Sequence, residues 1–181
     1  MFLSYECPSE AMVADPERAP RRIPLVQQTT RSRMALQLAT WFGCGRAPYA
    51  PGTAGTLGAL PLYFALRPFG HTAVALAALV LTGLGVWAAN IVASELGQKD
   101  PQVIVIDEVA GIFATLSAAP FTWKGVAAGV VLFRIFDVTK PWPARAAERK
   151  LGGGWGIVFD DVAAGIWAAL GVAALHAAKV L

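Results

Sequence analysis

Residues 71–93 form a long apolar segment that limits the folds open to this chain. No residue after His71 in this segment is charged. A helix of about 20 apolar residues is long enough to cross the hydrocarbon core of a bilayer. The segment lacks the strict alternation of apolar and polar residues that is typical of membrane barrel strands. Its length and pattern therefore predict a helix that spans or lies within a membrane.

The composition of the whole chain supports this interpretation. Of the 181 residues, 56% are hydrophobic and 15% are charged, against about 25% charged in typical soluble domains. So large an excess of apolar residues favours a protein partly covered by lipid, and the many Ala and Gly residues suit close helix packing there. A soluble all-α bundle remains the alternative. The net charge of +3 comes without a basic stripe interleaved with aromatic residues, so we expect no nucleic-acid partner.

We predict an all-α fold, a compact bundle of about six helices, several of them membrane-embedded. A flexible N-terminal tail, residues 1–33, precedes one helical domain, residues 34–181. The expected helical segments are 34–44, 57–66, 71–93, 103–119, 123–138 and 157–181. The segment after Glu108, residues 109–119, covers only about 16 Å as a helix, too little to cross about 30 Å of hydrocarbon. Three, four or five membrane spans therefore remain open.

The basic residues predict the orientation of these helices. Residues 18–33 contain five arginines and no acid, which places the tail on the cytoplasmic side by the positive-inside rule. The loops 94–102 and 140–156 then lie on the same side. The second loop carries Lys140, Arg145, Arg149 and Lys150 against the single acid Glu148. In this topology the acidic residues at helix ends meet at one membrane face.

Two acidic pairs stand in similar apolar surroundings, Asp107-Glu108 in VIVIDEVAGI and Asp160-Asp161 in GIVFDDVAAGI. In each motif an acid precedes a glycine by four residues, so close packing of the two helices would bring the acids together. Acidic residues at membrane depth are functional candidates, although a pair at a helix N-terminus also complements the helix dipole. Four clustered carboxylates need a cation, and an all-oxygen ligand set suits Mg²⁺.

Two further motifs are candidates for phosphate binding. FRIFDVTKPWP places Arg134, Asp137 and Lys140 three residues apart, a spacing that also fits a salt-bridge ladder at a helix end. Arg binds phosphate oxygens in a fork, and Lys acts as a point charge. PGTAGTLGALP places Thr53 and Thr56 before an apolar segment, where hydroxyl and backbone N–H groups bind anions or simply cap a helix.

These four motifs, in the order and spacing that they have along the chain, resemble the phosphatidylglycerophosphatase A family over about residues 36–178. The resemblance implies an all-helical, multi-pass protein of the bacterial inner membrane that dephosphorylates phosphatidylglycerophosphate to phosphatidylglycerol with Mg²⁺, at its cytoplasmic face. It carries the family's site residues over to Asp107, Glu108, Arg134, Asp137, Lys140, Asp160 and Asp161, whose motifs are intact here. The N-terminal tail has no part in it.

We therefore hypothesise metal-assisted phosphomonoester hydrolysis. Asp107, Glu108, Asp160 and Asp161 would bind Mg²⁺, and Arg134 and Lys140, with Thr53 and Thr56, would bind the phosphate. Asp137 would orient the two cations or complete the metal site. An aspartyl-phosphate route stays open, although no DxDxT/V motif is present. The chain also lacks the DGxxAR motif of CDP-alcohol phosphotransferases and the CxxxxxR motif of cysteine phosphatases. An ion-coupled transporter with a carboxylate-lined site is the alternative outside enzymes. The sequence indicates no oligomeric state.

Overall fold

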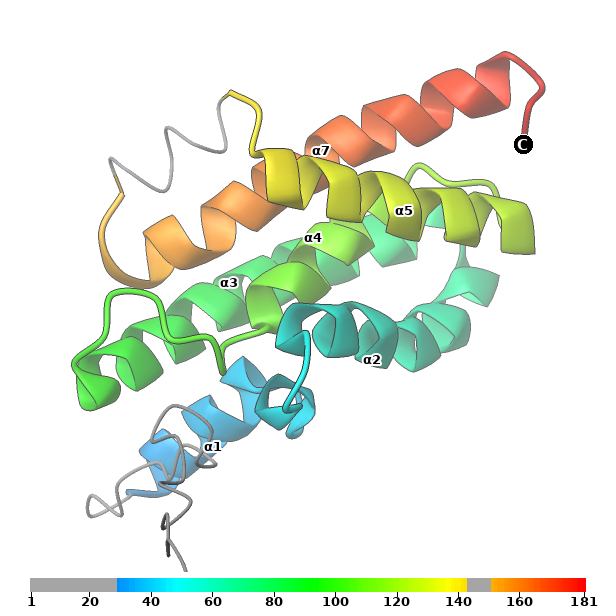
Figure 1. Cartoon of the computed structure of the whole chain (residues 1–181). Helices are drawn as coiled ribbons and strands as arrows, with labels where there is room; N and C mark the ends of the chain where they lie inside the picture. The colour runs from blue at the N-terminus through cyan, green and yellow to red at the C-terminus, as the bar shows by residue number, and fades with distance from the viewer. Residues whose placement is uncertain (1–28, 143–150) are drawn as a thin grey trace, which may run out of the picture.

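The computed structural model describes residues 29–142 and 151–181, and these residues form helices and no strands. The α-helices in chain order are α1 (Thr30–Ala39), α2 (Pro51–Leu66), α3 (His71–Leu96), α4 (Ile106–Leu116), α5 (Trp123–Thr139) and α7 (Gly153–Ala177), and two short 3₁₀-helices, η2 (Cys44–Arg46) and η3 (Arg67–Phe69), flank α2. The predicted all-α fold is therefore confirmed (Figure 1). The expected tail falls largely outside the described residues, as do Arg145, Glu148, Arg149 and Lys150 of the basic loop.

The short helix α4 lies at the centre of the bundle (Figure 1). It packs most extensively on α7, and also on α3, α2 and α5. Nine of its eleven residues are buried, among them the fully enclosed side chains of Val109, Ile112, Phe113 and Leu116. The burial explains how so short an apolar helix fits a bundle of longer ones, because its neighbours rather than lipid cover it. It also places Asp107 and Glu108, in its first turn, inside the bundle.

Capping residues that are common at helix termini mark the start of α5 and the end of α3. Thr122 caps α5 through a hydrogen bond that its side chain accepts from the backbone N–H of Gly125. Gly97, in a left-handed conformation, ends α3 three residues later than expected.

Several expected boundaries were wrong. Helix α4 covers Ile106–Leu116 rather than residues 103–119, and α7 covers Gly153–Ala177 rather than residues 157–181. The first helix runs from Thr30 to Ala39 rather than over residues 34–44, because Thr29 caps it by accepting a hydrogen bond from the N–H of Ser32. The Gly- and Pro-rich segment expected to be a loop supplies the first turn of α2, where Pro51 is favourable because no intrahelical partner is needed for its missing N–H. Pro61 lies within α2 without ending it.

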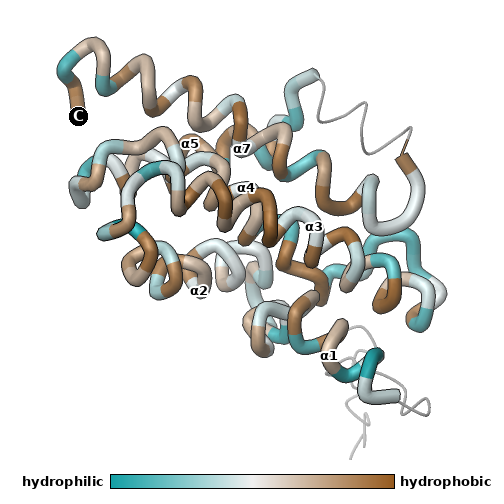
Figure 2. Tube along the Cα trace, turned by 180° about the vertical axis from the view of Figure 1, so that it is seen from behind, coloured by the Kyte–Doolittle hydropathy of each residue, from teal (hydrophilic) through white to brown (hydrophobic). Residues whose placement is uncertain are grey.

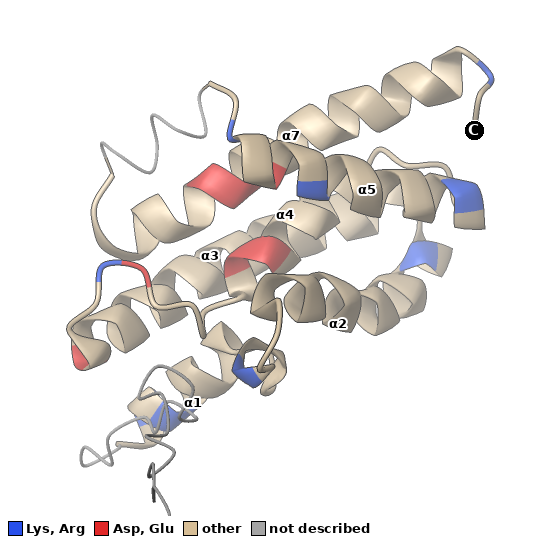
Figure 3. Ribbon diagram, viewed as in Figure 1, with Lys and Arg blue, Asp and Glu red and all other residues tan. Residues whose placement is uncertain are grey.

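Many charged residues lie toward the two ends of the bundle, as the red and blue ribbon segments show (Figure 3). Glu95 is in the last turn of α3, and Lys99 and Asp100 follow that helix. Arg67 follows α2, Lys124 is in the first turn of α5, and Lys179 follows α7. Between these ends hydrophobic residues recur along the helices (Figure 2), and large apolar side chains such as Leu76, Leu79 and Leu170 are exposed. The candidate site residues are the polar exception within this apolar band.

Candidate active site at the crossing of α4 and α7

Two glycines let α4 and α7 touch backbone to backbone. A Cβ atom on Gly165 would overlap the carbonyl oxygen of Gly111, and a Cβ on Gly111 would lie 2.7 Å from the carbonyl oxygen of Asp161. The buried hydroxyl of Thr115 can donate to the carbonyl oxygens of Gly111 (3.0 Å) and Gly165 (3.2 Å), which connects the two helices. The expectation that the acid-glycine motifs pack together is confirmed, whereas sequence reasoning did not identify Thr115.

This crossing brings three carboxylates into one cluster. One oxygen each from Asp107, Glu108 and Asp161 lie within 4.8 Å of one another. Asp107 and Asp161 are 9% and 5% exposed, and Glu108 is half-buried. Glu108 Oε2 is buried and accepts no hydrogen bond from any residue that the structure describes. Such a cluster has ligand atoms at the spacing of a metal site, and one of its buried oxygens, Glu108 Oε2, has no donor to satisfy it.

The electrostatics of the cluster also favour a bound cation. Burial raises the pKa of Asp107 well above its ordinary value, and the neighbouring charge of Glu108 raises it further. Burial raises the pKa of Glu108 as well, and the charge of Asp137 adds to that effect. Carboxylates crowded in this way stay ionised together only when positive charge is close.

Helix α5 supplies one cation beside the cluster. Arg134 Nη1 lies 2.7 Å from Asp137 Oδ2, yet this buried nitrogen makes no hydrogen bond of good geometry within the described residues. Asp137 in turn lies within side-chain hydrogen-bonding reach of Asp161. The arginine is therefore held at the edge of the carboxylate cluster, with its buried Nη1 paired to Asp137 but without a hydrogen bond of good geometry.

Lys140 ends α5 and forms a second ion pair. Its backbone takes the left-handed conformation (φ 43°), and its Nζ lies 2.5 Å from Asp160 Oδ2. Asp160 Oδ1 accepts a hydrogen bond from the N–H of Asp161. The two adjacent aspartates thus differ in surroundings, because Asp161 joins the three-carboxylate cluster and Asp160 pairs with a lysine. Asp100, which sequence reasoning passed over, lies near enough for its charge to act on Asp160.

The first turn of α2 reaches the same place. A Cβ on Gly52 would overlap Glu108 Oε1 and lie 3.2 Å from Arg134 Nη1. The buried hydroxyl of Thr56 donates to the carbonyl oxygen of Gly52, and Thr53 is half-buried. The structure thus brings the Gly-Thr motif to the acids through Gly52, while Thr56 supports the backbone of the turn.

A hydrogen bond and a close backbone contact between α3 and α7 position the N-terminal end of α7. Asn90 Oδ1 accepts a hydrogen bond of 2.7 Å from the N–H of Gly154. A Cβ on Gly154 would overlap the carbonyl oxygen of Val86, so the glycine permits this close approach. Gly153 and Gly154, which fall within the loop expected over residues 140–156, are instead the first residues of the helix that carries Asp160 and Asp161. No sequence signal pointed to Asn90.

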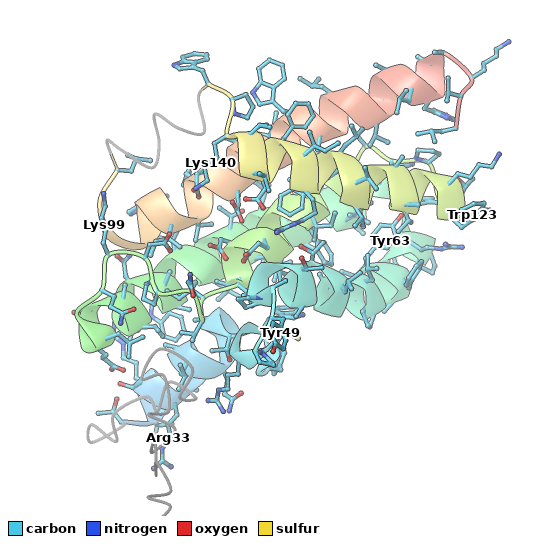
Figure 4. All side chains as sticks on the ribbon, in the orientation of Figure 1. Arg33, Tyr49, Tyr63, Lys99, Trp123 and Lys140 are labelled. Atoms are coloured by element: carbon cyan, nitrogen blue, oxygen red, sulfur yellow. The ribbon has the colours of Figure 1, made fainter. Side chains whose placement is uncertain are left out.

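Figure 3 shows acidic segments of α4 and α7 close to a basic segment of α5, and Figure 4 shows Lys140 beside α7, in agreement with the carboxylate cluster and the Lys140–Asp160 ion pair. All seven charged residues predicted from the sequence belong to this region, joined by the ion pairs and charge interactions described above. The arrangement can bind a divalent cation and an anion next to each other.

Comparisons with known proteins agree with this chemistry. The family model described as phosphatidylglycerophosphatase A matches residues 37–176. The phosphatidylglycerophosphatase A of Escherichia coli (strain K12) is 37% identical over 150 residues, covering 80% of this chain and 87% of the relative. That of Haemophilus influenzae (strain Rd) is 36% identical over 141 residues, covering 77% and 86%.

A protein of Bacteroides thetaiotaomicron, provisionally named a phosphatidylinositol-3-phosphatase, is 42% identical over 146 residues, covering 75% of this chain and 89% of the relative. No solved structure matches the chain. The family model covers nearly all of the helical bundle, including every candidate site residue. The chain therefore belongs to the phosphatidylglycerophosphatase A family.

Proposed function

We propose that this protein hydrolyses the terminal phosphomonoester of phosphatidylglycerophosphate, releasing phosphatidylglycerol and phosphate, with Mg²⁺ bound at the α4–α7 crossing. The main observation that supports this proposal is the three-carboxylate cluster of Asp107, Glu108 and Asp161 beside Arg134. Family membership supports the phosphatase activity. In this proposal the carboxylate cluster binds the metal, and Arg134 and Lys140 bind the phosphate.

The donor set of the cluster fits Mg²⁺. It consists of carboxylate oxygens, the hard ligands that this ion prefers, and Glu108 Oε2 is a buried acceptor in need of a positive partner. Mg²⁺ bound there would neutralise phosphate charge and lower the pKa of a coordinated water. Asp160 was predicted as a further ligand, but its pairing with Lys140 favours a role in phosphate binding instead.

The remaining residues bind and orient the phosphate. Arg134 offers its buried, incompletely bonded Nη1, and Asp137 fixes the guanidinium in place. Lys140, held by Asp160, adds a second positive charge. In the hydrolysis a water oxygen forms a bond to phosphorus, the bond from phosphorus to the glycerol oxygen breaks, and that oxygen leaves with a proton. Arg134 and Lys140 stabilise the negative charge that develops on the phosphoryl oxygens.

We also propose that the bundle is embedded in the inner membrane. Helices α3 and α7 are long and apolar enough to cross a bilayer, and in each less than half of the most apolar window is buried within the protein (39% and 44%). The exposed large apolar side chains of α2, α3, α5 and α7 would face lipid. The exposed residues Arg31 and Arg33 of α1 support a cytoplasmic location for that end.

In this placement the acids lie below the end of the bundle. Asp160 is seven residues into α7, about 10 Å along the helix from Gly153. The site would then sit near the headgroup level, where the phosphate of a membrane lipid is found. An ion-coupled transporter is not favoured, because the matching family and the named relatives are phosphatases.

The proposal is tested by purifying the protein in detergent and measuring phosphate release from phosphatidylglycerophosphate, with Mg²⁺ or with EDTA. We expect release that depends on Mg²⁺ and stops with EDTA. Absence of release under every metal condition would overturn the phosphatase proposal. Phosphatidylinositol 3-phosphate in a parallel assay tests the headgroup, and faster release from it would reassign the substrate.

A further inference from the structure

Helices α2 and α5 both pack on α4 but make almost no contact with each other. Figures 1 and 2, from opposite sides, place α2 and α5 on two different flanks of α4. The remaining neighbours of α4, helices α3 and α7, pack closely on one another. Helices α3, α7 and α5 thus pack on one another in turn around α4, whereas α2 makes little contact with α3 and still less with α5. We call the line between α2 and α5 the α2–α5 seam.

The contacts of α2 identify the side that faces the seam. Gly58 faces the loop after α1, because its carbonyl oxygen accepts a hydrogen bond from Trp41 Nε1, and Tyr63 packs against Phe113 of α4. The side of α2 left over, opposite Trp41, carries a row with helical spacing: Thr53, Leu57, Leu60 and Phe64. Leu57 and Phe64 are 53% and 46% exposed.

Helix α5 has a matching row. Gly129 faces Leu116 of α4, and Leu132 contacts Gly171 of α7. The side left over carries Ala127, Val131, Arg134 and Val138 at the same spacing. Val131 and Val138 are 58% and 75% exposed, and Arg134 is the single charged member of the row.

The polar end of the seam is the candidate phosphate site. Gly52 of α2 and Arg134 of α5 approach each other over Glu108, as the positions around a Cβ on Gly52 show. From that level α2 continues from Gly52 toward Phe64, and α5 extends back from Arg134 toward Ala127, on the two flanks of α4 (Figure 1). Each helix carries its apolar row along this stretch. From Gly52 to Phe64 is about 18 Å of helix, comparable with the roughly 15 Å of hydrocarbon in one leaflet.

We propose that the α2–α5 seam is the lateral entry path and acyl-chain site for the lipid substrate. The phosphate lies at Arg134, and one or both acyl chains lie against Leu57, Leu60, Phe64 and Val131. An arginine with apolar side chains beside it on α5 and across the seam on α2 matches an amphiphile with an anionic head, because the charge pairs with the head and the apolar surface with the acyl chains. This inference rests on the proposed function and adds how the substrate reaches the site without leaving the bilayer.

The first test narrows the seam with Leu57→Trp and Val131→Trp. The matched controls are Leu79→Trp on α3 and Leu170→Trp on α7, which replace side chains that are similarly exposed (69% and 58%) on faces away from the seam. Phosphate release is compared for diacyl phosphatidylglycerophosphate and for its deacylated, water-soluble headgroup. We expect both seam variants to lower kcat/KM for the diacyl lipid by about tenfold while leaving headgroup hydrolysis within about twofold of wild type.

The control variants should change neither rate. An equal loss on both substrates, an effect of the controls as large as that of the seam variants, or normal rates in both seam variants would overturn the proposal. If the wild-type protein releases no phosphate from either substrate, the proposed function has failed, and the second test still decides the binding site.

The second test uses the unmodified chain in nanodiscs and a phosphatidylglycerophosphate that carries a diazirine in one acyl chain. After illumination, peptides are mapped by mass spectrometry. We expect labelling of residues 57–64 and 127–131 that an excess of unlabelled phosphatidylglycerophosphate displaces, and labelling of the lipid face of α3 that it does not displace. Labelling of the seam that persists under competition, or no labelling there, would overturn the proposal.

Discussion

Gly165 of α7 lies directly against the carbonyl oxygen of Gly111 of α4, with no room for a side chain between them. Asp161 and Asp107 stand four residues, about one helical turn, before these glycines. The two acids are therefore neighbours because the two glycines are. Thr115 strengthens the same contact through its hydrogen bond to the carbonyl oxygen of Gly165.

Gly165→Ala should disrupt the site while leaving its charged residues unchanged. The added Cβ overlaps backbone atoms, which can move only if α7 shifts away from α4. We expect a stability loss of about 1–3 kcal/mol, typical of overpacking, and a loss of phosphatase activity of at least about tenfold. Thermal unfolding and phosphate release measure the two effects. The control is Gly83→Ala on α3, where a Cβ meets nothing within 4 Å and both quantities should stay near wild type.

Gly52→Ala should act on Glu108 specifically. The new methyl group would occupy the position of Glu108 Oε1 and crowd Arg134 Nη1. We expect weaker Mg²⁺ activation, seen as a higher Mg²⁺ concentration for half-maximal activity, with little change in thermal stability. Gly58→Ala lies in the same helix but faces Cys44 and Trp41, so it should leave the Mg²⁺ dependence unaltered. Equal shifts in both variants would show that α2, rather than Glu108, is responsible.

The two adjacent aspartates should give different kinetic defects. Asp161→Asn removes a carboxylate from the three-residue cluster, so we expect loss of Mg²⁺-dependent turnover that added Mg²⁺ restores only in part. Asp160→Asn keeps the three-carboxylate cluster intact and removes the ion pair between residue 160 and Lys140, so the main change should be in KM for the phospholipid. Steady-state kinetics at several Mg²⁺ concentrations separate these patterns. Identical defects would contradict the division of roles between the two residues.

Divalent cations should stabilise the folded protein without any substrate. A ligand that binds only the native state at about 100 times its Kd adds about 2.7 kcal/mol of stability. We therefore expect Mg²⁺ to raise the unfolding temperature of the detergent-purified protein and EDTA to lower it. In Asp107→Asn the effect of Mg²⁺ should be much smaller, because a ligand is lost and the like-charge repulsion that the cation relieves is reduced. An equal rise in both proteins would place the ion elsewhere.

The sequence predicted best those features that local signals determine. α3 and α5 begin at the expected residues, because Thr122 caps α5 and the apolar segment of α3 begins at His71. The acid-glycine spacing predicted the contact of α4 and α7, since four residues are about one turn. The seven charged site residues could be proposed because charged residues are rare in the apolar segments of this chain, and such residues in membrane segments are functional candidates.

What the sequence left undetermined depends on contacts between distant residues. Gly and Pro in the α2 motif are as common in loops as in a first helical turn, and the burial of Gly52 against Glu108 follows from packing alone. Asn90 and Thr115 are ordinary helix residues whose partners, Gly154 and Gly165, lie 64 and 50 positions away. The different partners of Asp160 and Asp161 likewise depend on where α5 ends, at Lys140.

The enclosure of α4 has a consequence for how the protein is made. A segment of eleven residues with two acids in its first turn is too short and too polar to enter a bilayer as an independent helix, since an acid at the centre of a membrane helix costs about 2.5–3.5 kcal/mol on insertion scales. If the bundle is embedded as proposed, α4 must enter together with helices that already cover it. The helix that carries Asp107 and Glu108 would then be among the last helices to reach its native position. A chain that inserts into the membrane but fails to enclose α4 would be full-length and would lack the active site.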